Sequence, residues 1–235
     1  EAEYHGDKSG WSISLNSDGT KLAIGAIDNY AYGDGDGPIH QIGHVRVYEW
    51  RQFTSEDNDN NSYYHHQNTP DNSLNIQDTT QPLPLIITGG SAPSPGTYYW
   101  TQMGKDIDGE ADLHYNNKSG WSVSLSSDGT RVAIGAYGND DGGSWAGHVR
   151  VYQWRKFTSQ DSGNYHYLNY TQNNTTQSLP LIITGGSAPI INTFYWTQLS
   201  YDIDGKAPDD EIGRSVSLSS NGNRVAISEY KFDGG

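Results

Sequence analysis

The sequence predicts an all-β protein built from tandem blades, each a small sheet of four or five short antiparallel strands. Two observations lead to this prediction: long blocks of sequence occur twice, and residues inside the blocks alternate between polar and apolar as strands do. The composition agrees, because 28 glycines, 17 tyrosines and 7 tryptophans in 235 residues are typical of strands and turns rather than of a helical bundle.

The blocks recur in the same order along the chain. KSGWSISLNSDGTKLAIGA begins at Lys8 and returns as KSGWSVSLSSDGTRVAIGA at Lys118, and a third, shorter copy opens at Gly213. Insertions and deletions fall between the blocks, so we expect the blocks to form the scaffold and the intervening segments to be surface loops. We divide the chain into the end of a preceding repeat (1–9), repeat 1 (10–119), repeat 2 (120–212) and a truncated repeat 3 (213–235).

Each repeat begins with a hairpin pattern. Residues 12–15 and 21–24 alternate between polar and apolar, and Asp18-Gly19 stands between them. Asp-Gly between two alternating runs favours a tight hairpin, because glycine accepts the positive φ that the turn requires. The same hairpin is predicted at 122–136 and, with Asn221-Gly222 as its turn, at 215–228.

Further strands complete each repeat. His44–Tyr48 alternates, Leu85–Thr88 is a short β-branched run, and Tyr98–Met103 is rich in aromatic residues. Four or five short antiparallel strands are the inventory of one β-propeller blade. Two full repeats and part of a third are fewer than the about four to eight blades that close a propeller. We therefore expect either an incomplete propeller or one that repeats from different chains complete.

The blocks resemble a known repeat family. The sequence at Gly120–Ala136 resembles the FG-GAP repeats of integrin-α-like β-propellers. The order SVSLSSDGT, VAIGA, GHVRVY, WTQL and DIDG looks like a tandem repeat of predicted extracellular proteins from algae, other protists and bacteria. The calcium loop of the family, an Asp-rich stretch between the first two strands, is replaced here by the short turn Ser126–Gly129. This turn cannot supply the about six to eight oxygens that calcium needs, so calcium binding is not expected there.

Other acidic loops leave two interpretations open. Alternate carboxylates on an extended loop can converge on a hard cation, and a structural calcium ion is therefore one interpretation. The other is a set of solvated turns, which we favour because none of the loops continues into the glutamate ending of an EF-hand. The sequence accordingly predicts no specific metal ligand and no cofactor. The loops are Asp34–Gly37, Asp106–Gly109, Asn139–Gly142 and Asp202–Gly205.

Five sequons are the most useful chemical signal in the chain. Four of them lie in long polar insertions between blocks, where an attached glycan would meet water. We predict that the sequons carry N-linked glycans if a eukaryote secretes the chain. They begin at Asn60, Asn117, Asn169, Asn173 and Asn174.

Several function classes are disfavoured. A net charge of −14 argues against a nucleic-acid partner, and no apolar run approaches the length of a membrane span. No hydrolase elbow, zinc-protease or phosphate-loop motif occurs, and the chain has no cysteine nucleophile. A catalytic group is needed once, whereas the conspicuous histidine and acids recur and therefore indicate a structural task. They are His44, Asp106 and Asp108, which return as His148, Asp202 and Asp204.

We therefore expect a non-enzymatic, extracellular or cell-surface glycoprotein with a structural or adhesive role, and specifically a subunit of a cell-surface or extracellular filament. Its partners would be copies of itself, joined head to tail, and its attached glycans. The alternative is a lectin-like, carbohydrate-binding β-propeller module that uses Trp145 and nearby tyrosines as stacking platforms for sugars.

Overall fold

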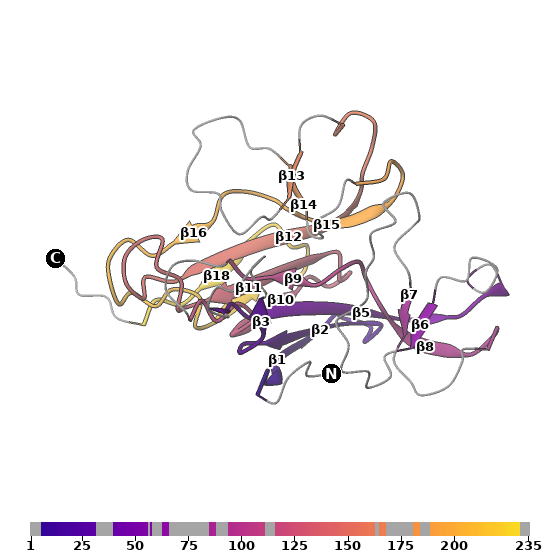
Figure 1. The fold of residues 1–235 in the computed structure, drawn as a ribbon, viewed down its shortest axis with the longest axis horizontal. Helices are drawn as coiled ribbons and strands as arrows, with labels where there is room; N and C mark the ends of the chain where they lie inside the picture. The colour runs from indigo at the N-terminus through magenta and orange to yellow at the C-terminus, as the bar shows by residue number, and fades with distance from the viewer. Residues whose placement is uncertain are drawn as a thin grey trace.

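The computed structural model describes residues 6–31, 40–55, 57, 63–65, 85–87, 94–110, 116–162, 165–167, 181–183 and 189–230. Within these ranges the eighteen named elements are all strands, which confirms the all-β prediction (Figure 1). They form two seven-stranded sheets, one in repeat 1 and one in repeat 2, and two small two-stranded sheets.

The two large sheets share one strand order, which confirms that the repeats are structural copies. The first runs β1 (Ser9–Leu15), β2 (Lys21–Ala26), β5 (His44–Gln52), β8 (Tyr98–Gln102), β7 (Leu85–Ile87), β6 (Tyr63–His65), with β9 (Ile107–Asp108) paired to β5. The second runs β10 (Ser122–Leu125), β11 (Arg131–Ala136), β12 (His148–Lys156), β15 (Phe194–Gln198), β14 (Leu181–Ile183), β13 (Tyr165–Tyr167), with β16 (Ile203–Asp204) paired to β12. The small sheets are β17 (Val216–Leu218) with β18 (Val225–Ile227), and β3 (Tyr30–Ala31) with β4 (His40–Gln41).

The predicted antiparallel blade is the four-stranded part of each large sheet that begins at β1 or β10, namely β1-β2-β5-β8 and β10-β11-β12-β15. Its four strands pair in register, so that Trp50 lies opposite Trp100 and Trp154 lies opposite Trp196. The outer strands differ from the prediction, because β6 pairs with β7 in parallel, and β13 pairs with β14 in the same way. A parallel pair needs a long crossover connection, and the polar insertions supply one. Figure 1 shows these outer pairs diverging from the shared centre.

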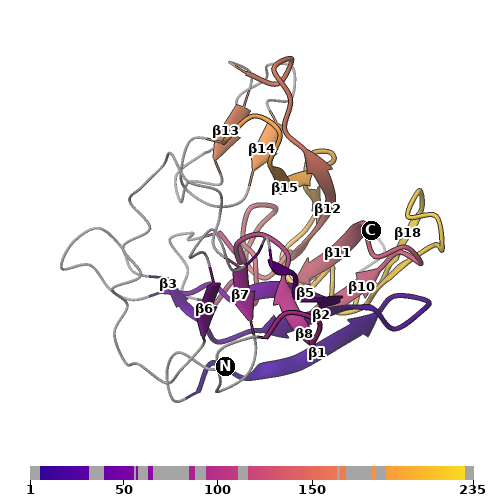
Figure 2. The ribbon, with the colours of Figure 1, turned by 90° about the vertical axis from the view of Figure 1, so that its right-hand side faces the viewer.

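The first hairpins of the three repeats stack face to face. The apolar sides of the first strands of repeats 2 and 3 pack on the sheet of the repeat before them. Leu125 of β10 belongs to one buried cluster with Ala23 and Val47 of repeat 1, and Val216 of β17 joins Ala133 of repeat 2. Figure 2 shows the hairpins in this order, from indigo to yellow. The hydrophobic core therefore lies between repeats as well as within them.

The serine side of the same strand faces the next repeat. Ser12 Oγ donates a hydrogen bond to the carbonyl oxygen of Gly120 at 2.7 Å, and the N–H of Leu125 donates to Ser14 Oγ at 3.0 Å. The equivalent bonds run from Ser122 Oγ to the Gly213 oxygen at 2.7 Å and from the Leu218 N–H to Ser124 Oγ at 2.9 Å. The polar positions of the alternating pattern thus join successive repeats.

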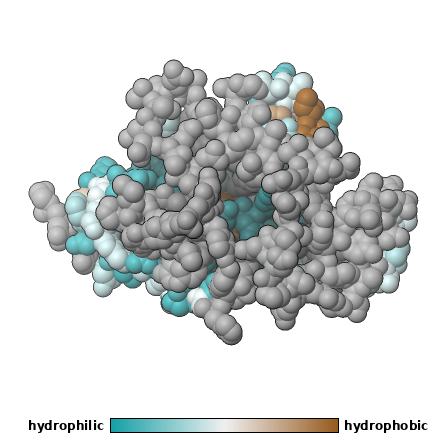
Figure 3. Space-filling model, in the orientation of Figure 1, coloured by the Kyte–Doolittle hydropathy of each residue, from teal (hydrophilic) through white to brown (hydrophobic). Residues whose placement is uncertain are grey.

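The described surface gives no sign of a bilayer-embedded helix. On the face shown in Figure 3 the described residues are mostly hydrophilic, apart from a small hydrophobic patch beside β15. Within the described part of the chain, no helix is long and apolar enough to span a membrane.

Two equivalent glycines provide a test of the stacking. Gly10 and Gly120 adopt φ values of 88° and 85°, so alanine strains the backbone equally at both positions. A Cβ at Gly120 would lie 2.8 Å from the His44 oxygen and 3.1 Å from Gly25 Cα, whereas a Cβ at Gly10 would have no atom within 4 Å. Only Gly120 is therefore enclosed by a preceding repeat.

We expect Gly120→Ala to destabilise the protein more than Gly10→Ala does. Both variants lose about 1–2 kcal/mol through the positive φ, and Gly120→Ala loses about 1–3 kcal/mol more through overpacking. Urea unfolding followed by tryptophan fluorescence measures the difference. Equal losses in the two variants would show that the inter-repeat contact does not contribute to stability.

Candidate functional site

A buried histidine, arginine and aspartate form a cluster in each large sheet. In repeat 1, β5 carries His44 and Arg46 on one face, and the residue before β9 is Asp106. Arg46 Nε lies 3.0 and 2.9 Å from the two Asp106 oxygens, and its NH2 group lies 2.8 Å from Oδ2. Gln102 Nε2 donates to Oδ1 at 2.7 Å. The aspartate is thus fully engaged by its own repeat.

The charges in this first cluster are fixed by its geometry. Burial by itself raises the pKa of Asp106, but the adjacent Arg46 outweighs it and lowers that pKa to about 2. Burial, the largest cause, and the charge of Arg46 together lower the pKa of His44 to about 4, although the charge of Asp106 opposes both effects. The imidazole is therefore neutral at pH 7, and the Arg46–Asp106 pair is ionised.

The second cluster differs because a glutamate from repeat 1 enters it. Arg150 NH2 lies 2.6 Å from Asp202 Oδ2 and also forms an ion pair with Glu110 Oε1. Arg150 thus forms ion pairs with two carboxylates. Its Nε and NH1 groups have no hydrogen-bond partner among the described residues. His148 Nδ1 likewise has none there and lies 3.9 Å from Asp202 Oδ2.

The second cluster holds more negative groups than positive ones. Burial raises the pKa of Glu110 to about 7, although Arg150 opposes this shift. Burial, together with the charges of Asp202 and Asp141, raises the pKa of Asp204 to about 6. Asp202 itself is raised by burial but more strongly lowered by Arg150, and its pKa lies at about 2. Excess negative charge in a partly buried place favours a bound cation.

The structure brings together most of the acidic loops singled out in the sequence. Asp106 and Asp108 meet His44, and Asp141 and Asp202 meet His148 and Glu110, with ligand atoms of each group within 4.8 Å of one another. The loop 34–37 lies outside the described residues. Sequence reasoning missed Glu110. The available signal was a difference between copies, since DIDG is followed by glutamate in repeat 1 and by Lys206 in repeat 2.

The hairpin turns use their own polar groups. Asp128 Oδ1 accepts hydrogen bonds from Ser126 Oγ at 2.7 Å and from the Thr130 N–H and Oγ1 at 2.9 Å each. These bonds lower the pKa of Asp128, with the backbone bond to Thr130 contributing most. The equivalent carboxylate of Asp18 is bound by Thr20 in the same way. The carboxylates of both turns are thus engaged by their own turn residues.

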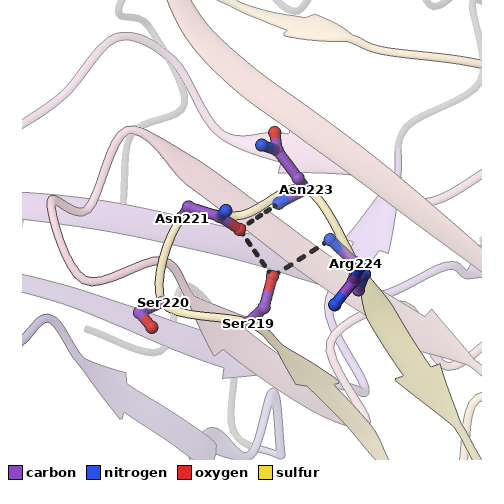
Figure 4. A pocket seen from close by; sticks show the side chains of 5 residues that line it. All are labelled: Ser219, Ser220, Asn221, Asn223 and Arg224. Carbon is purple, nitrogen blue, oxygen red and sulfur yellow. Dashed lines mark hydrogen bonds between the residues drawn. The ribbon is translucent and has the colours of Figure 1, made fainter.

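The turn between β17 and β18 forms an open pocket that follows the same design. Asn221 Oδ1 accepts from the Asn223 N–H at 3.1 Å and lies 2.9 Å from Ser219 Oγ, which accepts from the Arg224 N–H at 3.0 Å (Figure 4). Ser220 completes the lining. The bonds hold Ser219 Oγ and Asn221 Oδ1 within the turn itself.

Trp145 is not a free stacking platform. Its ring is partly buried and packs on Tyr137, with ring centroids 5.6 Å apart. Its backbone adopts a φ of 57°, and its N–H donates to Asp140 Oδ1 at 2.6 Å. The residue therefore has a clear structural task, and only part of its ring is accessible to a sugar.

Trp145 ends a row of aromatic rings that crosses the repeats. Tyr137 lies 4.4 Å from Trp121, and Trp121 lies 4.7 Å from Trp11, between ring centroids. The Arg214 guanidinium lies 4.6 Å from the Tyr137 ring and 5.8 Å from Trp121. Trp11, Trp121 and Arg214 occupy the same position in the three repeats, directly after a glycine. This row stabilises the stack through ring contacts and cation–π interactions.

One predicted sequon lies in the described structure. The Asn117 side chain is 1% exposed, and its two polar atoms have no hydrogen-bond partner in the described part of the chain. A glycan on Nδ2 would have to displace packed protein, so burial argues against a glycan here. The other four predicted sites lie outside the described residues: Asn60, Asn169, Asn173 and Asn174.

Comparison with known proteins supports the repeat assignment. Residues 100–152 match the FG-GAP repeat family. The matched segment runs from β8 to β12 and includes Glu110 and the hairpin of repeat 2. No curated protein matches the chain. The match confirms the resemblance to FG-GAP repeats, which are typical of β-propeller-type adhesion and binding modules and of extracellular proteins.

Because His44 is buried and uncharged, we expect the stability of the folded protein to depend on pH in the acid range. Its pKa of about 4 in the folded chain lies below the ordinary 6.5. Between these values the unfolded chain binds a proton that the folded chain does not, so stability falls as the pH falls through this window. We expect His44→Gln to reduce the slope of unfolding free energy against pH by up to about 1.4 kcal/mol per pH unit.

Urea unfolding at a series of pH values measures this slope. Asp18→Asn is the control, because hydrogen bonds to Thr20 lower the pKa of Asp18 below its ordinary value of 3.8, outside the window. An unchanged slope in His44→Gln would refute the assignment of the proton to His44.

Proposed function

We propose that the chain is a non-enzymatic, extracellular structural or adhesive protein whose copies join head to tail into a filament. The observation that carries the proposal is the apolar side of β1. Ile13 and Leu15 are 67% and 57% exposed, whereas Leu125, the equivalent of Leu15, is 7% exposed because repeat 1 covers it. Apolar side chains that are core residues in one repeat and exposed in another indicate a docking surface.

The β17–β18 hairpin offers the complementary surface. Ala226 is exposed, whereas the equivalent Ala23 and Ala133 are buried beneath the following repeat. Ser217 is also exposed, and its equivalents Ser14 and Ser124 accept hydrogen bonds from the following repeat. In the proposed contact, β1 of one copy packs on the β17–β18 hairpin of another copy in the way that β10 packs on β2 within the chain. The contact joins opposite ends of two copies and is therefore head to tail. Such a contact propagates into a filament unless it closes into a ring.

The lack of catalysis and the glycans belong to the same proposal. In repeat 1 the histidine, arginine and aspartate are paired with one another, and they recur in repeat 2, which supports a structural task. Glycans on the sequons of the polar insertions suit an extracellular filament, because they keep its sides hydrated.

Removing the apolar side of β1 should abolish assembly. We expect Ile13→Asp combined with Leu15→Asp to convert assemblies to monomers, because two charges then face a docked hairpin. The matched control is Ile191→Asp, which replaces a 49% exposed isoleucine on another part of the surface. Sedimentation velocity and negative-stain electron microscopy of native and variant chains measure the outcome. Monomers of the unaltered chain at high concentration would refute the filament.

The aromatic row favours one alternative, a carbohydrate-binding module. Tryptophan and tyrosine rings in a row are suited to stacking on successive sugars, and Trp11 at one end of the row is 48% exposed. The tilt of 44° between Trp11 and Trp121 weakens this alternative, because a flat platform would need nearly coplanar rings.

A glycan array distinguishes the alternative. If the module binds carbohydrate through this row, Trp145→Ala should lower the affinity at least about tenfold, the equivalent of a lost stacking contact of more than 1 kcal/mol. Trp50→Ala is the control, because Trp50 is 42% exposed and stacks on Tyr98 in a separate group of rings. The absence of saturable binding to any glycan would exclude this function.

A further inference from the structure

We propose that the second cluster is a zinc-binding site that joins repeat 1 to repeat 2. Its ligands are Glu110, which follows β9 of repeat 1, together with Asp141, His148 and Asp202 of repeat 2. One ligand atom from each of these four residues lies within 4.8 Å of the others. The proposal does not depend on assembly of the chain into filaments.

His148 is the residue that points to a metal. Its side chain is 2% exposed, and burial keeps its pKa at about 3, so the imidazole is neutral. Nδ1 faces the carboxylates, 3.9 Å from Asp202 Oδ2, and has no hydrogen-bond partner among the described residues. An unpartnered buried nitrogen is costly. A neutral imidazole nitrogen with a free lone pair is also the form in which histidine binds metals.

The charges around His148 also call for a cation. Among the described residues, the carboxylates of Glu110, Asp141 and Asp202 gather beside His148, and the Arg150 guanidinium pairs with Glu110 and Asp202, so a divalent ion would offset the remaining negative charge. Arg150 does not exclude the metal, because ligating carboxylates are normally held by hydrogen-bond partners of their own. Arg150 contacts both Glu110 and Asp202 and is suited to orienting them.

The donor set selects the kind of ion. Calcium and magnesium are bound by oxygen ligands, whereas a histidine nitrogen beside carboxylates suits zinc and its neighbours among the divalent transition metals. Four protein ligands agree with the closed tetrahedral coordination of a structural zinc site. Such an ion would stabilise the junction between the repeats, because its ligands come from both.

Repeat 1 provides an internal control. His44, Asp106 and Asp108 form the equivalent group. Arg46 and Gln102 engage both Asp106 oxygens, just as Arg150 and Gln198 engage both Asp202 oxygens, so the aspartates do not distinguish the clusters. The position equivalent to Asp141 is Ala31, which has no ligand atom. Within the described residues, the two clusters therefore share a repeat motif, and the second alone adds a glutamate and a further loop aspartate.

Calorimetric titration of the whole, untagged chain with zinc chloride after chelator treatment tests the proposal. We expect a zinc site that raises the thermal unfolding temperature and is not displaced by calcium. His148→Gln should abolish this site, and the exposed Asp141→Asn should weaken zinc binding by at least about tenfold without disturbing the fold. His44→Gln should leave zinc binding unchanged. X-ray absorption of the zinc complex should show one nitrogen with oxygen ligands.

Three results would overturn the proposal. The first is an unaltered chain that shows neither zinc heat nor a zinc-dependent rise in unfolding temperature. The second is equal zinc affinity in the unaltered chain and in Asp141→Asn. The third is a loss of zinc affinity in His44→Gln as large as the loss in His148→Gln. Zinc would then bind to both histidine clusters alike, or to no specific site.

Discussion

The architecture depends on backbone contact between successive repeats at glycine. A Cβ at Gly25 would overlap the carbonyl oxygen of Gly120, and a Cβ at Gly135 would overlap that of Gly213. Because neither glycine carries a side chain, the second strand of one hairpin lies directly against the start of the next repeat. The inter-repeat serine hydrogen bonds and the apolar contacts of the first strands are possible only at this separation.

The same stacking places the histidine clusters of the two repeats at equivalent positions. The chemistry of the two clusters differs because their neighbouring residues differ. His44 and His148 occupy one position in two sheets, yet among the described residues Arg46 beside His44 pairs with Asp106, whereas Arg150 beside His148 is shared between Asp202 and Glu110. The difference arises from Glu110, which enters from the neighbouring repeat. In a repeat protein the copied residues build the scaffold, and a residue that enters from the neighbouring repeat can create a site at a junction.

Much of the scaffold could be predicted from the sequence. The Asp-Gly turns and the alternating strands follow from local patterns, and the structure confirms these hairpins. The strand at Leu85–Thr88 was predicted and is β7, but β6 and its parallel pairing with β7 could not be predicted, because the long polar insertion between them carries no clear period. The acids of the second cluster were identifiable in part: Asp141 and Asp202 stand in visible acidic loops, whereas Glu110 follows a repeated motif as an unremarkable surface residue would.

The sequence by itself determined the repeated hairpins, the blades and their order, because turn chemistry and alternation act over a few neighbouring residues. Only the tertiary structure decided what the polar residues do. It made Ser14 a partner of Leu125, buried Asn117 and packed Trp145 on Tyr137. It also brought Glu110 to Arg150. Most of these contacts join residues far apart in the chain, and the close stacking of repeats, which no local pattern encodes, sets their distances.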